Sequence, residues 1–210
     1  MWLNIYTLET IYLTLILVPT LFVFLRVFNL YSFSKHKGLL YFSGAFLLFA
    51  CSFMIRYLII ITTSGPNNIE PLPGISPWVI ILELALLFPG ILFIFSLSWK
   101  KMPKLTFLAV FVGALVVSIA DYLMGTLILM YISQIIIFII ASFLAYRNLK
   151  RDKKPMQQVF LACMLLFVLV WIINLVGQLF IPVLPVLRIV VYILTIIIAY
   201  TLLIMVNKIT

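Results

Sequence analysis

Arg56 and Glu83 are ionisable side chains inside apolar stretches, where together they could form an ion pair. Arg56 lies about six residues before the end of one stretch, and Glu83 about six residues after the start of the next. At about 1.5 Å per residue, both lie roughly 9 Å deep. Because an unpaired buried ion costs several kcal/mol, we expect Arg56 and Glu83 to form a structural ion pair between adjacent helices.

Two later stretches carry polar side chains at helical spacing. Asn174 and Gln178 are four residues apart, as are Arg188 and Tyr192, so each pair occupies one face of a helix. Lipid is an unfavourable surrounding for either face. We therefore predict an outward-facing ligand site lined by Arg56, Glu83, Asn174, Gln178, Arg188 and Tyr192.

This set of side chains combines two cationic groups with one anionic group, which favours a small polar or anionic ligand. A second interpretation stays open, because Asn and Gln side chains also hydrogen-bond across membrane helices without any ligand. Glu9, Asp121 and Arg188 lie close enough to helix ends to reach water. The sequence therefore leaves both a pocket and simple interhelical bonding as accounts of the polar residues.

The sequence contains few residues that could carry out catalysis or bind a metal. His36 is the single histidine, and with Cys51 and Cys163 it cannot supply a closed zinc site. We therefore expect no catalytic residue, no metal site and no cofactor. The carboxylates in or beside the apolar stretches, Glu9, Glu83 and Asp121, could carry out proton chemistry only if they converge.

Seven apolar stretches must position these side chains. Hydrophobic residues make up 66% of the chain and charged residues 9%, with a mean hydropathy of +1.33, whereas a soluble domain is about 45–50% apolar. A helix that crosses a bilayer needs about 20 apolar residues. We expect an all-α membrane protein, with a single seven-transmembrane helix bundle over residues 1–210. The predicted spans are Ile5–Leu25, Leu39–Thr62, Pro77–Leu97, Leu105–Tyr122, Thr126–Tyr146, Gln157–Phe180 and Leu184–Val206.

Lysine and arginine fall in every second gap between these stretches, and the second, fourth and sixth gaps contain none. Cytoplasmic loops of membrane proteins carry the excess of basic residues. The pattern therefore predicts a multi-pass plasma-membrane protein with its N-terminus outside and its C-terminus in the cytoplasm. It also accounts for the net charge of +9 without nucleic acid as a partner. The basic residues at these positions are Arg26, Lys35, Lys37, Lys100, Lys101, Lys104, Arg147, Lys150, Arg151, Lys153, Lys154 and Lys208.

The two ends of the chain are weakly similar to each other. Aligning residues 24–56 with residues 143–175, an offset of 119 (143 − 24), matches Phe24 with Phe143 and Asn29 with Asn148, among others. This is compatible with a 3+1+3 parallel repeat of residues 5–98 and 126–207, joined by a linker helix at 105–123. Whether the repeat is genuine stays open. Prolines inside two spans, Pro19 and Pro89, predict kinks.

The layout resembles prokaryotic seven-transmembrane sensors and receptors of the microbial rhodopsin type. The features that carry the resemblance are the outside N-terminus, the cytoplasmic C-terminus, the short loops and the polar interior near the outer surface. The chain departs from that family in its last span, where Arg188 and Lys208 lie at the ends and no lysine lies in the middle. Retinal is therefore not implied. The layout is also similar to sugar and vitamin porters with 3+1+3 repeats.

Three classes of function remain, in decreasing order of support. The first is a sensor or receptor-like module that binds a small polar ligand and acts through a membrane or cytoplasmic signalling partner. The second is a small-solute transporter, which should show polar groups along both halves of its pathway. The third is an intramembrane enzyme. All three share the lipid bilayer as their surroundings.

Overall fold

The computed structural model describes residues 5–63, 77–86, 88, 90–98, 104–152, 155–180 and 185–208. These residues form helices joined by short connections, and they contain no strand. The helices are α1 (Ile5–Ser34), α2 (Lys37–Thr63), α3 (Pro77–Leu86), α4 (Gly90–Ser98), α5 (Lys104–Met124), α6 (Ile128–Asp152), α7 (Pro155–Phe180) and α8 (Pro185–Asn207).

Six apolar segments are long enough to cross a membrane, which identifies a multi-pass helical membrane protein. One of them, Val79–Leu97, combines α3 and α4. The apolar part of α5, Leu108–Met124, is shorter than the other six. The prediction of an all-α membrane protein is therefore confirmed, whereas the number of spans is not decided by length alone.

The predicted third span is interrupted in the middle. Helix α3 ends at Leu86, Phe88 is not helical, and α4 begins at Gly90. A proline at position 89 has no backbone N–H and clashes with the preceding turn, which explains a break at this point. By contrast, α1 passes Pro19 as a single helix and continues to Ser34, beyond the predicted end at Leu25.

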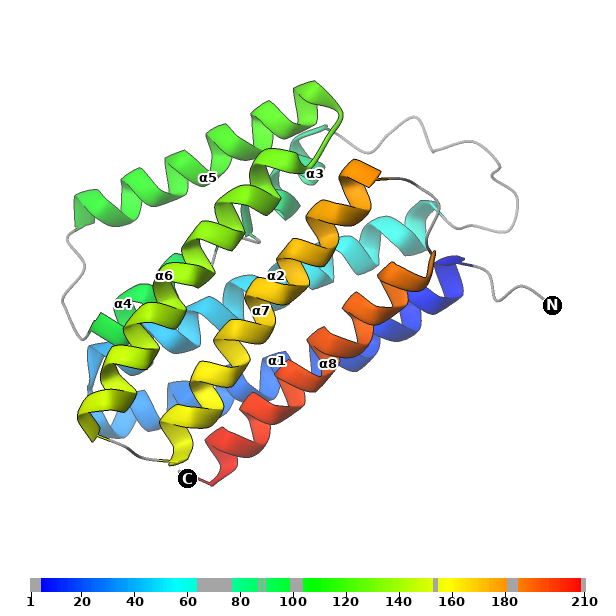
Figure 1. The fold of residues 1–210 in the computed structure, drawn as a ribbon. Helices are drawn as coiled ribbons and strands as arrows, with labels where there is room; N and C mark the ends of the chain where they lie inside the picture. Colours follow the sequence, from blue (N-terminus) through cyan, green and yellow to red (C-terminus); the bar gives the residue numbers. More distant parts are fainter. Residues whose placement is uncertain are drawn as a thin grey trace.

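The six long apolar segments, with α3 and α4 counted together as one, form a closed ring, and α5 lies outside it. Around the ring, α1 packs on α2, α2 on α3 and α4, α4 on α6, α6 on α7, α7 on α8, and α8 on α1. Helix α5 contacts α3 and α6 from the outer side (Figure 1). The first and last helices are thus neighbours, and the ring surrounds a central space.

Successive helices alternate in direction, except that α3 and α4 together form one apolar segment, so the bundle has two distinct ends (Figure 1). We call the end where α1 begins and α2 terminates the N-terminal end. The opposite end contains Lys35 and Lys37 between α1 and α2, and Lys150 and Arg151 in the last turn of α6. We call this the basic end. Among the described residues, the basic side chains of the first and fifth predicted gaps therefore lie at one end of the bundle.

Towards the basic end, the middle of the ring is filled by aromatic side chains around Phe93. This side chain is fully buried, and its ring lies between 5.4 and 6.5 Å from six other phenylalanine rings. These rings come from α2, α6 and α7, so Phe93 of α4 connects three helices. The neighbouring rings belong to Phe42, Phe46, Phe49, Phe138, Phe160 and Phe167.

Candidate functional site

A cavity of about 300 Å³ lies inside the ring, between α1, α2, α3, α7, α8 and the start of α6. The structure brings all six of the predicted site residues to its wall. Arg56 comes from α2, Glu83 from α3, and the remaining four from α7 and α8. These four are Asn174, Gln178, Arg188 and Tyr192.

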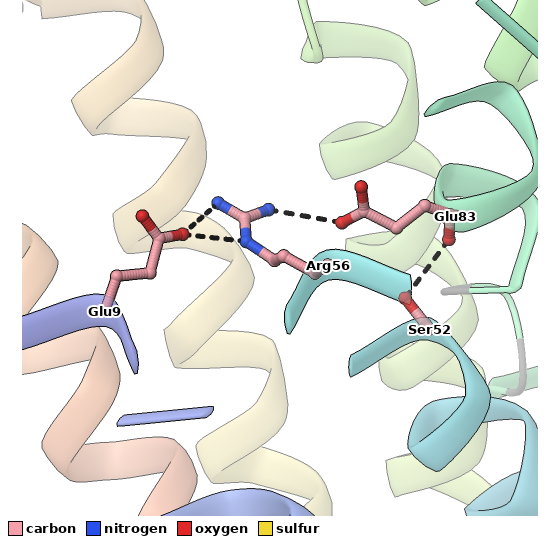
Figure 2. A network of polar contacts seen from close by, with 4 residues as sticks. All are labelled: Glu9, Ser52, Arg56 and Glu83. Carbon is pink, nitrogen blue, oxygen red and sulfur yellow. Dashed lines mark hydrogen bonds and ion pairs between the residues drawn. The ribbon is translucent and has the colours of Figure 1, made fainter. Parts of the chain in front are cut away.

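Arg56 is the centre of the polar contacts near this cavity (Figure 2). Its Nη1 lies 3.4 Å from Oε1 of Glu83, the predicted partner. Glu9 of α1 lies closer, because its Oε1 is 2.6 Å from Nη2 and 2.8 Å from Nε of Arg56. Arg56 therefore links three helices through two carboxylates, and the nearer carboxylate is the one that sequence reasoning did not assign to it.

The three charged side chains differ in their exposure. Glu9 and Glu83 keep only 11% and 8% of their side-chain surface accessible, whereas Arg56 keeps 45%. Because Arg56 lines the cavity, part of this accessible surface faces the internal space. Two carboxylates and one guanidinium carry a net charge of −1 when all are ionised, so the group as a whole is not neutral.

A further contact holds α3 against α2. The hydroxyl of Ser52 donates a hydrogen bond of 3.1 Å to the backbone carbonyl of Glu83 (Figure 2). Ser52 and Arg56 are four residues apart on α2, so they present the same helical face to α3. The backbone and the side chain of Glu83 are thus both held by α2.

Three other polar side chains of the wall lack such partners. Asn174, Gln178 and Arg188 make no hydrogen bond or ion pair with any other residue in the described part of the chain. Trp171 also lines the cavity, and its buried indole N–H has no acceptor within the described ranges. Asn174 is half-buried and Gln178 and Arg188 are exposed, whereas the indole N–H of Trp171 is a buried unsatisfied donor, which is uncommon in folded interiors. The wall therefore offers a cation, two amides and an indole donor that the described protein residues do not satisfy.

A stacked tyrosine pair closes the gap between α1 and α8. The rings of Tyr12 and Tyr192 are 4.0 Å apart and nearly parallel. The hydroxyls of Tyr12 and Thr195 are hydrogen-bonded at 3.2 Å, and Thr195 also donates to the carbonyl of Val191 at 2.7 Å. The ring of Tyr192 is therefore positioned by α1, a contact that the spacing of residues on α8 alone could not predict.

The cavity is polar near the N-terminal end and apolar deeper in the bundle. Its polar side chains lie within about seven residues of the helix ends there, whereas the deeper wall consists mainly of aliphatic and aromatic side chains. The deeper part is lined by Leu13, Ile16, Thr20, Phe46, Phe49, Ser52, Phe53, Phe167, Val170, Thr195, Ala199 and Leu202.

Asp121 has a structural role outside this cavity. Its side chain is fully buried, and its two carboxylate oxygens accept hydrogen bonds from the backbone N–H groups of Leu129 and Met130 at 3.0 and 2.7 Å. These are first-turn donors of α6, which have no partner within the helix. Asp121 does not reach water as the sequence suggested, and it does not converge with Glu9 and Glu83.

Comparison with protein-family models, with curated proteins and with solved structures finds no match for this chain. Function must therefore be inferred from the geometry of the cavity and from the membrane topology.

Proposed function

We propose that this protein is a seven-span plasma-membrane protein that binds a small polar ligand in the ring cavity and acts as a sensor or receptor-like module through a signalling partner. The observation that supports the proposal is the convergence of six polar side chains on one cavity of about 300 Å³. This volume lies at the lower end of the range of small-molecule sites, about 300–1,000 Å³.

The proposed orientation has the N-terminus outside and the C-terminus in the cytoplasm. Lys35, Lys37, Lys150 and Arg151 support it, because they gather at the end of the bundle where the positive-inside rule requires them. In this orientation the polar part of the cavity lies towards the outside. In the proposal, α5 is the seventh span, packed against the outer side of the ring.

The contacts of Glu9 change the balance of charge at the proposed ligand site. The site residues predicted from the sequence include two cations and one carboxylate, but Glu9 adds a second carboxylate beside Arg56. The overall count is then even, and it no longer favours an anion. The preference rests on Arg188 instead, because Arg56 contacts both carboxylates while Arg188 contacts neither in the described chain.

Transport is the second candidate function. A ring of six segments with α5 outside it is compatible with a 3+1+3 arrangement, which supports transport. The wall of the cavity argues against a continuous polar pathway. The cavity ends at residues such as Thr20, Phe46 and Leu202. The aromatic cluster around Phe93 fills the middle of the ring towards the basic end. Binding without flux is therefore the better account of this conformation.

An intramembrane enzyme has the least support. Of the three carboxylates that could carry out proton chemistry, Glu9 and Glu83 both contact Arg56, and Asp121 caps α6. No pair of them is left to act as a separate acid and base.

Ligand-dependent thermal stabilisation tests the proposed function. We expect a panel of small carboxylates, phosphates, amino acids and sugars to include compounds that raise the melting temperature of the purified protein, because a ligand at 100 times its Kd stabilises by about 2.7 kcal/mol. Asn174→Ala and Arg188→Gln should abolish this increase. Asn29→Ala and Arg147→Gln are matched controls, because both residues are exposed outside the cavity wall.

Equal stabilisation of the wild type and both cavity variants would contradict the proposed site. Uptake into proteoliposomes separates the two leading functions. Saturable flux of a stabilising compound would support transport, whereas binding without flux would support a sensor.

A further inference from the structure

The residues that line the cavity extend along much of α8. Arg188 and Leu202 both line the cavity and are 14 residues apart on α8 (202 − 188), which corresponds to about 21 Å along the helix. A cavity whose wall extends over this length can accommodate an extended chain.

Apart from the indole N–H of Trp171 beside Val170, the deeper wall offers no free hydrogen-bond donor to a polar ligand. Its three hydroxyl groups all donate to backbone carbonyls: Ser52 to Glu83, Thr20 to Ile16, and Thr195 to Val191, at 3.1, 2.6 and 2.7 Å. The other deep side chains are aliphatic or aromatic. Water is poorly satisfied in such surroundings, so apolar groups are the better occupant of this part.

The polar end offers the opposite chemistry. Arg188 has neither a hydrogen bond nor an ion pair with the rest of the described chain, and the amides of Asn174 and Gln178 are likewise without partners there. A guanidinium and two amides together can bind a carboxylate or a phosphate through charge-assisted hydrogen bonds. An anionic group is therefore the best match for the end of the cavity that faces away from the basic end.

We propose that the cavity binds an amphiphile, with its anionic head at Arg188 and one apolar chain extending past Phe49 and Phe167 towards Leu202. The inference rests on the ligand site of the proposed function and identifies the chemical class of the ligand. Free fatty acids and membrane lipids that insert one acyl chain share this chemistry. The proposal differs from a small polar ligand because the chain must contribute to affinity.

Tryptophan quenching can detect the chain directly. The chain has four tryptophans, and replacing Trp2, Trp78 and Trp99 with phenylalanine leaves Trp171 in the cavity wall as the only one. The probe is dodecanoate brominated at mid-chain, added to this variant in nanodiscs of zwitterionic lipid. We expect saturable quenching that unbrominated dodecanoate reverses by competition. Butanoate, which has the same head and a short chain, should compete at least tenfold more weakly.

Two substitutions test the two ends of the amphiphile separately. Arg188→Gln should weaken dodecanoate binding at least tenfold, whereas Arg147→Gln, an exposed arginine near the basic end, should leave it unchanged. Ala199→Leu adds volume to the deep wall and should shift the preferred chain length from dodecanoate towards octanoate. Thermal unfolding without ligand establishes that each variant is folded. If Ala199→Leu does not fold, Ala199→Val adds a smaller volume at the same position and should cause a smaller shift in the same direction.

The outcomes distinguish this inference from the proposed function. If butanoate competes as well as dodecanoate, and Arg188→Gln weakens the binding of both, the proposal of an amphiphilic ligand is wrong, whereas the proposed polar ligand site is supported. If quenching by brominated dodecanoate is not saturable, or is unchanged in Arg188→Gln, the proposal of an amphiphilic ligand is overturned. If a brominated anionic phospholipid in the nanodisc gives saturable quenching that Arg188→Gln reduces, the amphiphile is supported and the source of its chain is the bilayer.

Discussion

Arg56 contacts two carboxylates from two different helices, and the closer one belongs to α1 (Figure 2). Removing one partner from a buried ionic contact leaves an uncompensated charge, which is usually more damaging than removing all partners together. The stability of this end of the bundle should therefore depend on the balance of charge between Glu9, Arg56 and Glu83. It should depend less on any one of these side chains alone.

We expect Arg56→Met to reduce the free energy of unfolding by about 3 kcal/mol, the lower end of the range for a broken buried pair, because Arg56 keeps accessible surface in the cavity. Adding Glu9→Gln and Glu83→Gln in the same chain should restore part of this loss. The measurement is reversible unfolding in mixed micelles, analysed as double-mutant cycles.

The coupling energy between Glu9 and Arg56 should exceed that between Glu83 and Arg56, since the distances are 2.6 and 3.4 Å. Arg147→Met is the control for loss of an exposed arginine. Strictly additive losses would show that the charges do not interact.

Much of the candidate site could be predicted from helical spacing and depth. Polar helical faces should turn away from lipid, and the four residues that this rule predicts on α7 and α8 all line the cavity: Asn174, Gln178, Arg188 and Tyr192. Glu9 was not assigned to Arg56, because its position near a helix end also fitted contact with water. The pairing depends on the rotation of α1 against α2, which one sequence does not encode in its spacing.

Asp121 illustrates the same limit for a buried carboxylate. Its position near a helix end suggests contact with water, yet both of its oxygens accept hydrogen bonds from the first turn of α6. Each hydrogen bond to a charged group contributes about 1.5–3 kcal/mol. We expect Asp121→Ala to lower the free energy of unfolding by about 3 kcal/mol, and Asp121→Asn, which keeps one acceptor oxygen, to lower it less.

Unfolding in mixed micelles measures this effect, and ligand-dependent stabilisation serves as the second readout. Because Asp121 lies outside the cavity wall, both variants should keep the ligand response of the wild type at temperatures where they are folded. Loss of the response in folded Asp121→Asn would place this residue in the binding site after all.

At the scale of helices, α4 approaches α6 so closely that a side chain at position 90 has no room. A Cβ atom on Gly90 would lie 2.6 Å from Cγ2 of Ile137 and 3.2 Å from a ring carbon of Phe138. Gly113 in α5 has nothing within 4 Å of the corresponding position. These two glycines are therefore a matched pair for testing close packing.

We expect Gly90→Ala to destabilise the protein by about 1–3 kcal/mol through overpacking. Gly113→Ala should be neutral or stabilising by up to about 1 kcal/mol, because alanine favours the helix. Thermal and denaturant unfolding in the same detergent provide the comparison. Ile137→Ala should relieve part of the loss in the Gly90→Ala background. Equal effects of the two alanine substitutions would contradict the close approach of α4 and α6.

The helices themselves could be predicted closely from apolar runs, because lipid requires every backbone polar group to bond within its own segment. Predicted and observed boundaries differ by only a few residues for α2, α5, α7 and α8. The largest differences occur where a helix extends beyond its apolar run, as at Ser34 in α1 and Asp152 in α6. Hydropathy predicts the membrane-embedded part, whereas a helix can continue into water.

At the scale of the whole molecule, the arrangement of the helices explains why one cavity forms. Six segments close into a ring, and the aromatic rings around Phe93 fill its middle towards the basic end. The N-terminal half of the ring contains polar side chains and more free space. The order of helices around the ring depends on contacts between α1 and α8, which lie at opposite ends of the sequence, so apolar periodicity alone could not predict it.

The proposed topology makes the last prediction, which concerns both the number of spans and their direction. In a variant with Cys51 and Cys163 replaced by alanine, single cysteines at Met124 and Lys35 lie at opposite ends of the bundle. An impermeant thiol reagent added to intact cells should label Met124→Cys and not Lys35→Cys, because the basic end faces the cytoplasm. Permeabilised cells should label both.

Asn67 and Lys153, which sequence analysis predicts on opposite sides, lie outside the described residues and extend the same test. Asn67→Cys should be labelled in intact cells, and Lys153→Cys only after permeabilisation. If α5 does not cross the membrane, Met124 and Lys35 must fall on the same side, since an even number of spans then separates them. Labelling of both residues in intact cells, or of neither, would therefore overturn the seven-span topology, whereas labelling of Lys35→Cys alone would reverse its direction.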